Sequence, residues 1–367
     1  MTAATSPVEY ALSMPLSLFH AEHPGAWDAF LASQRFRPFL QSWTMGEVYR
    51  DVGQEPFRLE VRENGDIVGV CLAHVVNARR GRHLSIPYGP VTHHPEALRL
   101  MIEELKRIGR ELGCAFVRLS PFLPATSPLL PILKESKGKS SPLHLLAEHI
   151  WYLPLQYPDC WDDFASNAPP ERRVEDEIFA KMRSTARNLI RRAERDGVTI
   201  TRSASPIDDL PHFLRLHDET RRRHHFVPYT NAFFRAQVSQ FSPKKEVSIY
   251  LAHYQGEVIS ASIHMHFGGE TSYHHGASTQ KFKNIPSSYL LQWKAVTDAL
   301  ERGDHVYNFW GVSPEGVRRH PFAGVRTFKT AFGGRILELA HCTDLPLSAK
   351  YYVTRSIETA RKWRRGF

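Results

Sequence analysis

The chain has 367 residues, 42% of them hydrophobic, and a formal net charge of +9 at pH 7. That length exceeds the usual size of a single hydrophobic core, so we expect two domains of roughly 150–200 residues each. No apolar run approaches the ~18 residues of a membrane span, and residues 1–5 lack the pattern of a secretory signal. We therefore expect a cytosolic protein, and the excess of cations favours polyanionic partners.

The first half of the chain contains strand-like runs and one helix. Alternation of polar and apolar residues predicts strands at 57–62, 67–76, 83–87 and 115–120. The first two runs meet at a turn around Gly65, which is typical of a β-hairpin. From 95 to 112, apolar residues recur every three or four positions, which indicates an amphipathic helix that ends before Gly113.

The second half repeats this order. We expect strands at 247–254, 258–267, 271–275 and 305–310, and a helix at 289–300. Gly256 and Gly303 take the places that Gly65 and Gly113 have in the first set. Three strands, a helix and a further strand resemble the core of the GNAT-type acyltransferase fold. We therefore predict an α/β protein, of α+β type, with two tandem GNAT-like domains.

Neither thiols nor imidazoles form a recognisable metal-binding pattern. The four cysteines have no Cys-x-x-Cys spacing, and their apolar surroundings predict reduced, structural thiols. Adjacent histidines such as His274 and His275 point to opposite sides of a strand, whereas a zinc site needs three or four converging ligands. We therefore predict no metal site.

Basic residues are concentrated in the segment 181–195, for which we predict one helix, ended by Gly197. Arg183, Arg187 and Arg191 fall on one stripe of that helix. The stripe is interpreted either as a solvated face or as a contact with RNA or pyrophosphate. A second basic segment, 355–365, is open to three interpretations: contact with tRNA, contact with a bilayer surface, or a solvated chain end.

Four stretches taken together resemble the FemABX family. They are residues 39–43 with 86–90, residues 191–198, residues 307–311 and residues 322–334. The resemblance implies a groove for a cell-wall precursor and a channel for the 3′ end of a charged tRNA. It also implies an aminoacyltransferase that moves an amino acid from aminoacyl-tRNA to the stem-peptide amine of a peptidoglycan precursor, UDP-linked or lipid-linked, and so forms an interpeptide bridge.

The resemblance assigns roles to particular residues. It places Phe328 and Lys329 at the tRNA channel, where the lysine ammonium would stabilise the charge that develops on the ester carbonyl. The precursor contacts that it implies are Tyr49, Arg50, Tyr88, Tyr229, Asn308 and Trp310. The tRNA contacts that it implies are Arg183, Arg187, Arg191 and Arg192. Tyr49 stands where well-known relatives have a lysine, and Asn308 replaces an aspartate.

The same resemblance divides the chain into two functional domains. The first, expected at 1–149 plus 345–367 with a C-terminal helix, would bind the precursor. The second, expected at 150–344, would hold the tRNA channel and the transfer site. The segment 210–246 is too short for the coiled-coil arm of some family members. Aminolysis of an activated ester needs neither metal nor cofactor, and we expect a cytoplasmic monomer, with a peripheral contact at the inner face of the membrane left open.

Two other functions remain open from the sequence. An acyl-CoA-dependent GNAT N-acyltransferase would need a glycine-rich turn for the CoA pyrophosphate, but residues 280–286 contain no glycine and Pro286 lacks an amide donor. A non-catalytic RNA-binding protein would account for the net charge and the arginine stripe. It would leave the repeated acyltransferase-like core unexplained.

Overall fold

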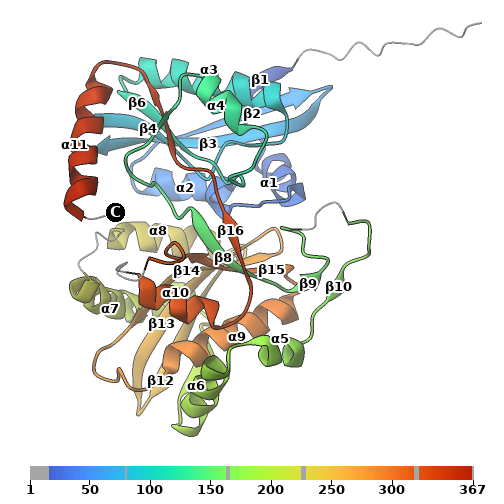
Figure 1. Cartoon of the computed structure of the whole chain (residues 1–367), viewed down its shortest axis with the longest axis vertical. Coiled ribbons are helices and arrows are strands. Elements are labelled where there is room, and N and C mark those ends of the chain that lie inside the picture. Colours follow the sequence, from blue (N-terminus) through green and yellow to red (C-terminus); the bar gives the residue numbers. More distant parts are fainter. Residues whose placement is uncertain (1–15, 79–80, 163–165, 225–228, 318–321, 366–367) are drawn as a thin grey trace, which may run out of the picture.

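The computed structural model describes residues 16–78, 81–162, 166–224, 229–317 and 322–365. Within these ranges the chain forms two large mixed β-sheets with helices on their faces, one above the other along the long axis (Figure 1). We call each sheet with its helices a lobe. The predicted α/β class is confirmed. Among the described residues, no helix combines the length and the apolar character that crossing a bilayer requires.

The first lobe is built on a sheet with the strand order β1-β2-β3-β4-β6-β17-β7, to which β5 is added through β3. Its strands are β1 Ser17–His20, β2 Pro56–Glu63, β3 Asp66–Ala78, β4 Gly81–Pro87, β5 Val91–Thr92, β6 Phe116–Ser120, β7 Lys139–Ser140 and β17 Thr343–Pro346. Its helices are α1 Pro24–Ser33, η1 Phe39–Gln41, α2 Trp43–Asp51, α3 Pro95–Glu111, α4 Leu130–Glu135 and α11 Lys350–Arg365. The four predicted strands and the predicted helix of the first half are confirmed as β2, β3, β4, β6 and α3.

The second lobe has the strand order β11-β12-β13-β14-β15-β8-β16. Its strands are β11 Thr199–Arg202, β12 Val247–Tyr254, β13 Glu257–Phe267, β14 Glu270–Ser278, β15 Val306–Gly311, β8 His149–Pro154 and β16 Arg335–Glu338, with a small separate pair of β9 Gln156–Tyr157 and β10 Glu171–Arg172. Its helices are α5 Glu175–Lys181, α6 Ser184–Arg195, α7 Pro206–His224, α8 Asn231–Phe241, α9 Ser287–Arg302 and α10 Ala323–Thr330. The repeated strand and helix predictions are confirmed as β12, β13, β14, β15 and α9.

Period-two alternation in the central strands sorts side chains between two cores. In β3, Val70 and Leu72 pack in a cluster with α1 and α2, whereas Cys71 and Ala73 pack in a cluster with α3. The strand is therefore apolar on both faces, which explains why it reads as an almost continuous hydrophobic run.

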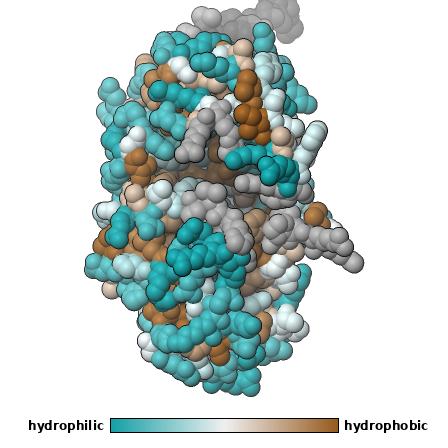
Figure 2. All heavy atoms as spheres, turned by 90° about the vertical axis from the view of Figure 1, so that its left-hand side faces the viewer, coloured by the Kyte–Doolittle hydropathy of each residue, from teal (hydrophilic) through white to brown (hydrophobic). Residues whose placement is uncertain are grey.

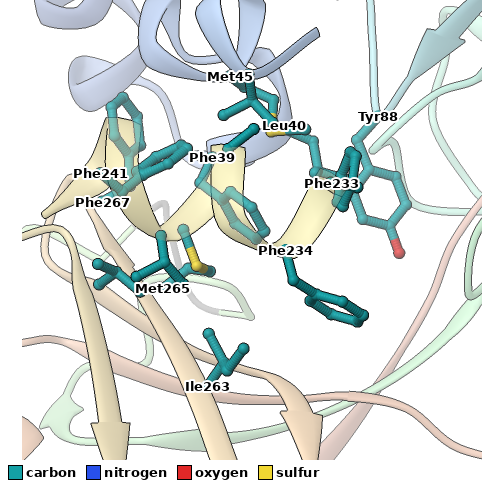
Figure 3. Close-up of a cluster of buried hydrophobic side chains, with 14 of the residues drawn as sticks. Phe39, Leu40, Met45, Tyr88, Phe233, Phe234, Phe241, Ile263, Met265 and Phe267 are labelled. Atoms are coloured by element: carbon teal, nitrogen blue, oxygen red, sulfur yellow. The ribbon is translucent and has the colours of Figure 1, made fainter. Parts of the chain in front are cut away.

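One hydrophobic core is shared by both lobes. It contains Met45 of α2, Phe234 and Phe241 of α8, and Ile263 of β13. Figure 3 shows the aromatic side chains of α8 between Met45 of the first lobe and the strands of the second. Because helices of the two lobes bury the same apolar surface, the lobes form one packed body.

The lobes are also joined by the path of the chain. After β7 of the first sheet the chain enters the second as β8, and after β16 it returns to the first as β17. A buried ion-pair network secures the return, because Arg118 of β6 donates at 2.7 Å both to Asp344 of β17 and to Glu358 of α11. The C-terminal helix is therefore part of the first lobe.

The prediction of one helix over 181–195 is wrong at its beginning. Met182 and Arg183 are extended and separate α5 from α6. The Arg183 amide donates to the distant Ala331 carbonyl at 3.0 Å, and the Arg187 guanidinium donates to the Met182 carbonyl at 2.7 Å. These two hydrogen bonds provide partners for backbone groups at the break between α5 and α6. Only the predicted end of the helix at Gly197, which has a φ of 85°, is confirmed.

The described part of 210–246 forms no projecting arm. Its helices α7 and α8 pack against each other, and α7 also packs on β12, β13 and β14. The prediction that this chain lacks a coiled-coil arm is confirmed for the described residues.

Candidate active site

The second sheet opens between β14 and β15. In these parallel strands, residues 270–272 of β14 pair with residues 306–308 of β15. The pairing stops after Ser272 and Asn308. The equivalent strands of the first sheet, β4 and β6, stay paired over five residues on each strand. On its other edge, β15 pairs with β8 up to Asn308 and again at Gly311, so that Phe309 and Trp310 lie outside both ladders. Where parallel strands separate, their backbone N–H and C=O groups become available to other hydrogen-bond partners.

Lys329 occupies this opening. It lies near the end of α10, only 8% exposed, and its Nζ donates to the Gly311 carbonyl at 2.8 Å. The same Nζ lies 5.4 Å from the centroid of the Tyr273 ring, the first residue of β14 beyond the paired segment. Burial lowers the pKa of Lys329 to about 7. The group therefore changes charge near neutral pH in a poorly solvated place.

Phe328 points away from that opening. Its ring packs against Tyr289 at 4.9 Å and Phe332 at 5.6 Å, on the core side of α10. Residues 323–330 form a helix, and the adjacent side chains of Phe328 and Lys329 therefore point in different directions. Phe328 anchors the helix, and this fixes the position of the Lys329 backbone.

Trp310 forms the wall of the opening that faces the first lobe. Its backbone has a φ of 65°, unusual for a bulky residue, and its N–H donates to Asn308 Oδ1 at 2.8 Å. The indole lies 4.9 Å from the His274 ring, 5.7 Å from Phe39 and 5.5 Å from Tyr88. Asn308 is buried and holds the turn, so it reaches the site only through Trp310.

Three tyrosines predicted as precursor contacts share one neighbourhood. Tyr88 is buried with a φ of 55°, and its hydroxyl donates to the Ala147 carbonyl at 2.8 Å. Tyr49 is buried and stacks on His74 at 3.9 Å, whereas Tyr229 is 45% exposed. Burial raises the pKa of both Tyr49 and Tyr88, and the nearby Tyr229 phenol raises each further. Of the three, only Tyr229 offers a substantial free surface.

Arg50 is directed outward from α2. Its guanidinium forms ion pairs with Glu47 and, at 3.7 Å, with Glu55. It lies next to Tyr49 in the chain, but its charge is balanced by these two carboxylates.

The four predicted tRNA contacts lie at or on α6, which runs away from α10 toward the far end of the second lobe (Figure 1). Arg183, Arg191 and Arg192 are exposed. Arg191 lies over the Phe179 ring at 5.3 Å, and Arg192 donates to the Asn284 carbonyl at 3.2 Å and pairs with Asp196 at 3.3 Å. The arginines therefore form a ridge held by local contacts, with its first member beside the end of α10.

Sequence reasoning missed His274 and His275, which it examined only as metal ligands. Among the described residues, neither ring nitrogen of His274 has a hydrogen-bond partner, nor has Nε2 of His275. Burial lowers the pKa of His274 to about 3, and the Lys329 charge adds to the shift. The feature that could have indicated these two histidines is their position on β14, the strand that lines the opening. Figure 2 shows a hollow between the two lobes with hydrophobic surface at its floor.

Three potential metal ligands do converge elsewhere, at the two crossings between lobes. Nδ1 of His144 and Nδ1 of His341 lie 2.9 and 2.8 Å from the Glu148 carboxylate, which also accepts the Cys342 N–H. Burial raises the pKa of Glu148, but these hydrogen bonds outweigh it and lower the pKa to about 2. We assign the cluster to an ion-paired contact between the crossing segments. His144 and Glu148 are four residues apart, but His341 is 193 residues from Glu148, so a spacing pattern does not reveal the cluster.

The two sheets share the order of their first five strands, β1-β2-β3-β4-β6 and β11-β12-β13-β14-β15, and the second opens beside a buried lysine. These features define a tandem GNAT-like protein. In agreement, the fold is similar to the crystal structure of FemX, with a TM-score of 0.77 and 18% identity over 93% of this chain and 100% of that chain. It is also similar to the tandem GNAT protein of the clavulanic acid biosynthesis pathway, with a TM-score of 0.52 and 10% identity over 91% of this chain and 99% of that chain. The FemAB family model matches residues 23–256 and 252–359, so the chain belongs to the FemAB family.

Curated relatives match over shorter stretches. The aminoacyltransferase FemA of Staphylococcus epidermidis is 28% identical over 94 residues, which is 25% of this chain and 22% of that relative. FemA of Staphylococcus aureus strain MW2 is 31% identical over 83 residues, 23% of this chain and 20% of that relative. The chain thus spans less than a quarter of these relatives in the matched regions. The resemblance to the FemABX family is confirmed.

Proposed function

We propose that this protein is an aminoacyltransferase that moves an amino acid from aminoacyl-tRNA to the stem-peptide amine of a peptidoglycan precursor, and thereby helps to form an interpeptide bridge. Membership of the FemAB family and relatives named aminoacyltransferase support this. The observation that carries the proposal is the buried ammonium of Lys329 in the opening between β14 and β15.

The reaction is aminolysis of an ester. The acceptor amine attacks the aminoacyl carbonyl, a C–N bond forms, the ester C–O bond breaks, and the tRNA hydroxyl leaves with a proton derived from the amine. Negative charge develops on the carbonyl oxygen before the ester breaks. An ammonium has three donors. Among the residues that the structure describes, the Gly311 carbonyl accepts one of those of Lys329, so we assign the others to the oxyanion. Alignment of the two substrates could contribute ~7–11 kcal/mol of the rate acceleration.

We assign the expected division of labour to the two lobes. In this proposal, residues 1–149 with 345–367 bind the precursor, with Tyr49, Arg50, Tyr88 and Tyr229 around its groove, and residues 150–344 receive the tRNA along Arg183, Arg187, Arg191 and Arg192. Trp310 and Asn308 then shape the boundary between the two substrates. Because aminoacyl-tRNA is a cytoplasmic molecule, the reaction takes place on that side of the membrane.

Acyl transfer from CoA is the second candidate, favoured only by the fold. The loop that precedes α9 has no glycine between 280 and 286, and the Asn284 carbonyl in it is occupied by Arg192. A pyrophosphate cradle needs free backbone amides at the start of a helix, and here Pro286 provides none.

The test is to incubate the purified protein with a pool of charged tRNAs and either the UDP-linked or the lipid-linked precursor, and to follow the precursor mass. We expect a gain of one or more amino-acid residues, lost in Lys329→Met and kept in Lys283→Met, an exposed lysine in the loop before α9. Transfer from acetyl-CoA without any tRNA-dependent gain contradicts the proposal.

A further inference from the structure

Helix α11 lies along the outside of the first lobe with one face firmly attached (Figure 1). Tyr351 is fully buried, with its ring 5.4 Å from Phe116, and Glu358 is buried against Arg118 at 2.7 Å. Thr354 is buried between them. Three buried residues at helical spacing fix the rotation of the helix, and therefore determine which residues face away from the lobe.

The opposite side of α11 exposes large apolar side chains. Tyr352 is 53% exposed, Val353 63%, Ile357 40% and Trp363 80%. At about 100° per residue, these four positions fall within a sector of about 140° on the helix surface. No other helix in the described ranges exposes four large hydrophobic residues. We call this set the apolar stripe. Single exposed hydrophobic residues are ordinary, but several large ones on the same side of one helix are typical of a binding surface.

Cations flank the apolar stripe. Lys350, Arg361 and Arg364 are exposed, Lys362 is half-buried, and the single acidic residue between 350 and 364 is Glu358, which is turned inward to Arg118. Lys139 of β7 adds a further ammonium 6.0 Å from the Tyr352 ring. The accessible surface of α11 therefore combines apolar residues, a tryptophan and positive charge without compensating acid.

The combination of exposed apolar residues and cations on α11 indicates which kind of partner would bind there. A nucleic acid would use the cations but would leave Val353, Ile357 and Trp363 in water. A bilayer with anionic headgroups takes both parts, because the apolar side chains enter the acyl boundary, the indole prefers the interfacial region and the cations meet the lipid phosphates. Helix α11, like the other described helices, is not long and apolar enough to cross a bilayer, so the contact considered for it is with the membrane surface.

We propose that α11 docks on the surface of an anionic membrane through the apolar stripe, and so brings the transfer site to a lipid-linked precursor. The second part rests on the proposed function, since it chooses between the two precursor forms left open above. Docking itself requires only the helix and the lipid.

Vesicle co-sedimentation tests the docking. The vesicles contain either phosphatidylglycerol with phosphatidylethanolamine or phosphatidylcholine alone, and the full chain is compared with the triple variant Val353→Ser, Ile357→Ser, Trp363→Ser. We expect the variant to bind the anionic vesicles at least about tenfold more weakly, because it loses the apolar anchor. The matched control is Ile207→Ser on α7, 39% exposed like Ile357 at 40%, which should bind as the native chain does. All the substituted side chains are exposed, so the variants should fold.

Several results overturn the docking proposal. Equal binding by the triple variant, binding to phosphatidylcholine as strong as to anionic vesicles, or no vesicle binding by the native chain would each do so. If the triple substitution instead weakens tRNA binding, or converts a dimer to a monomer in light scattering, α11 serves RNA or a second copy. Transfer to the lipid-linked precursor solubilised in detergent, without vesicles, separates the two proposals, because it tests the chemistry without membrane docking.

Discussion

Replacing Lys329 by methionine should stabilise the fold while abolishing transfer. Methionine has nearly the same length and an apolar tip, so it fills the buried position without a charge to desolvate. Burial lowers the pKa of the lysine from an ordinary value of 10.5 to about 7. Burying the ammonium of Lys329 therefore lowers the unfolding free energy of the native protein, and the methionine variant has no such cost.

The size of that cost depends on pH. Below pH 7 the lysine is protonated in both states, and the difference of 3.5 pKa units corresponds to about 5 kcal/mol of unfolding free energy. Between pH 7 and 10.5 the unfolded state binds more protons than the folded one, so native stability rises with pH. The unfolding free energy of the variant should then exceed that of the native chain by about 4 kcal/mol at pH 7 and by about 2 kcal/mol at pH 9.

Urea unfolding of both proteins at pH 6, 7.5 and 9 measures these differences, and Lys283→Met shows the effect of removing an exposed lysine, which should stay within about 0.5 kcal/mol. A variant less stable than the native chain would refute the reasoning. So would an advantage that does not shrink between pH 6 and pH 9, since it would reflect packing and not the titration of Lys329.

Three further perturbations test other parts of the structure. Arg118→Met leaves the Asp344 and Glu358 carboxylates buried without their partner, so it should destabilise the first lobe by about 3–5 kcal/mol in urea unfolding and expose α11 to proteases; resistance of α11 would contradict this. Ser42→Ala removes the acceptor of the Met45 N–H at the start of α2 and should cost about 1 kcal/mol, which Ser42→Asp should largely restore. Trp310→Gly relieves a positive φ but removes a packed indole, so a net loss of about 1–3 kcal/mol and a raised KM for the precursor are expected; a gain in stability would show that strain outweighs packing.

Local patterns were enough to predict the repeated core. The hairpins around Gly65 and Gly256 and the helices α3 and α9 are encoded by alternation, helical spacing and turn residues, all of which act between near neighbours. The break at Met182 and Arg183 was missed because its cause is a hydrogen bond to Ala331, far along the chain. Tertiary partners of that kind leave no periodic signal in the sequence.

The candidate site was only partly predictable. Similarity to a motif pointed to Lys329, but its burial and the opening beside it depend on where β14 and β15 stop pairing. Asn308 and Tyr88 are buried and form hydrogen bonds to the Trp310 N–H and the Ala147 carbonyl, which the sequence did not indicate; their contact with substrate stays a prediction. His274 was overlooked because its isolation from hydrogen-bond partners is a property of the packed structure, which the identity of its neighbours in sequence does not express.

The return of the chain as β17 has a consequence for synthesis on the ribosome. The first sheet needs β17 between β6 and β7, and α11 to pair Glu358 with Arg118, yet both follow the whole second sheet in the chain. Domains usually fold as they emerge, N-terminal part first. Here the N-terminal sheet waits with the β6 edge open until the residues after the second sheet have been made. A nascent chain stalled before residue 343 should therefore be the species that chaperones hold.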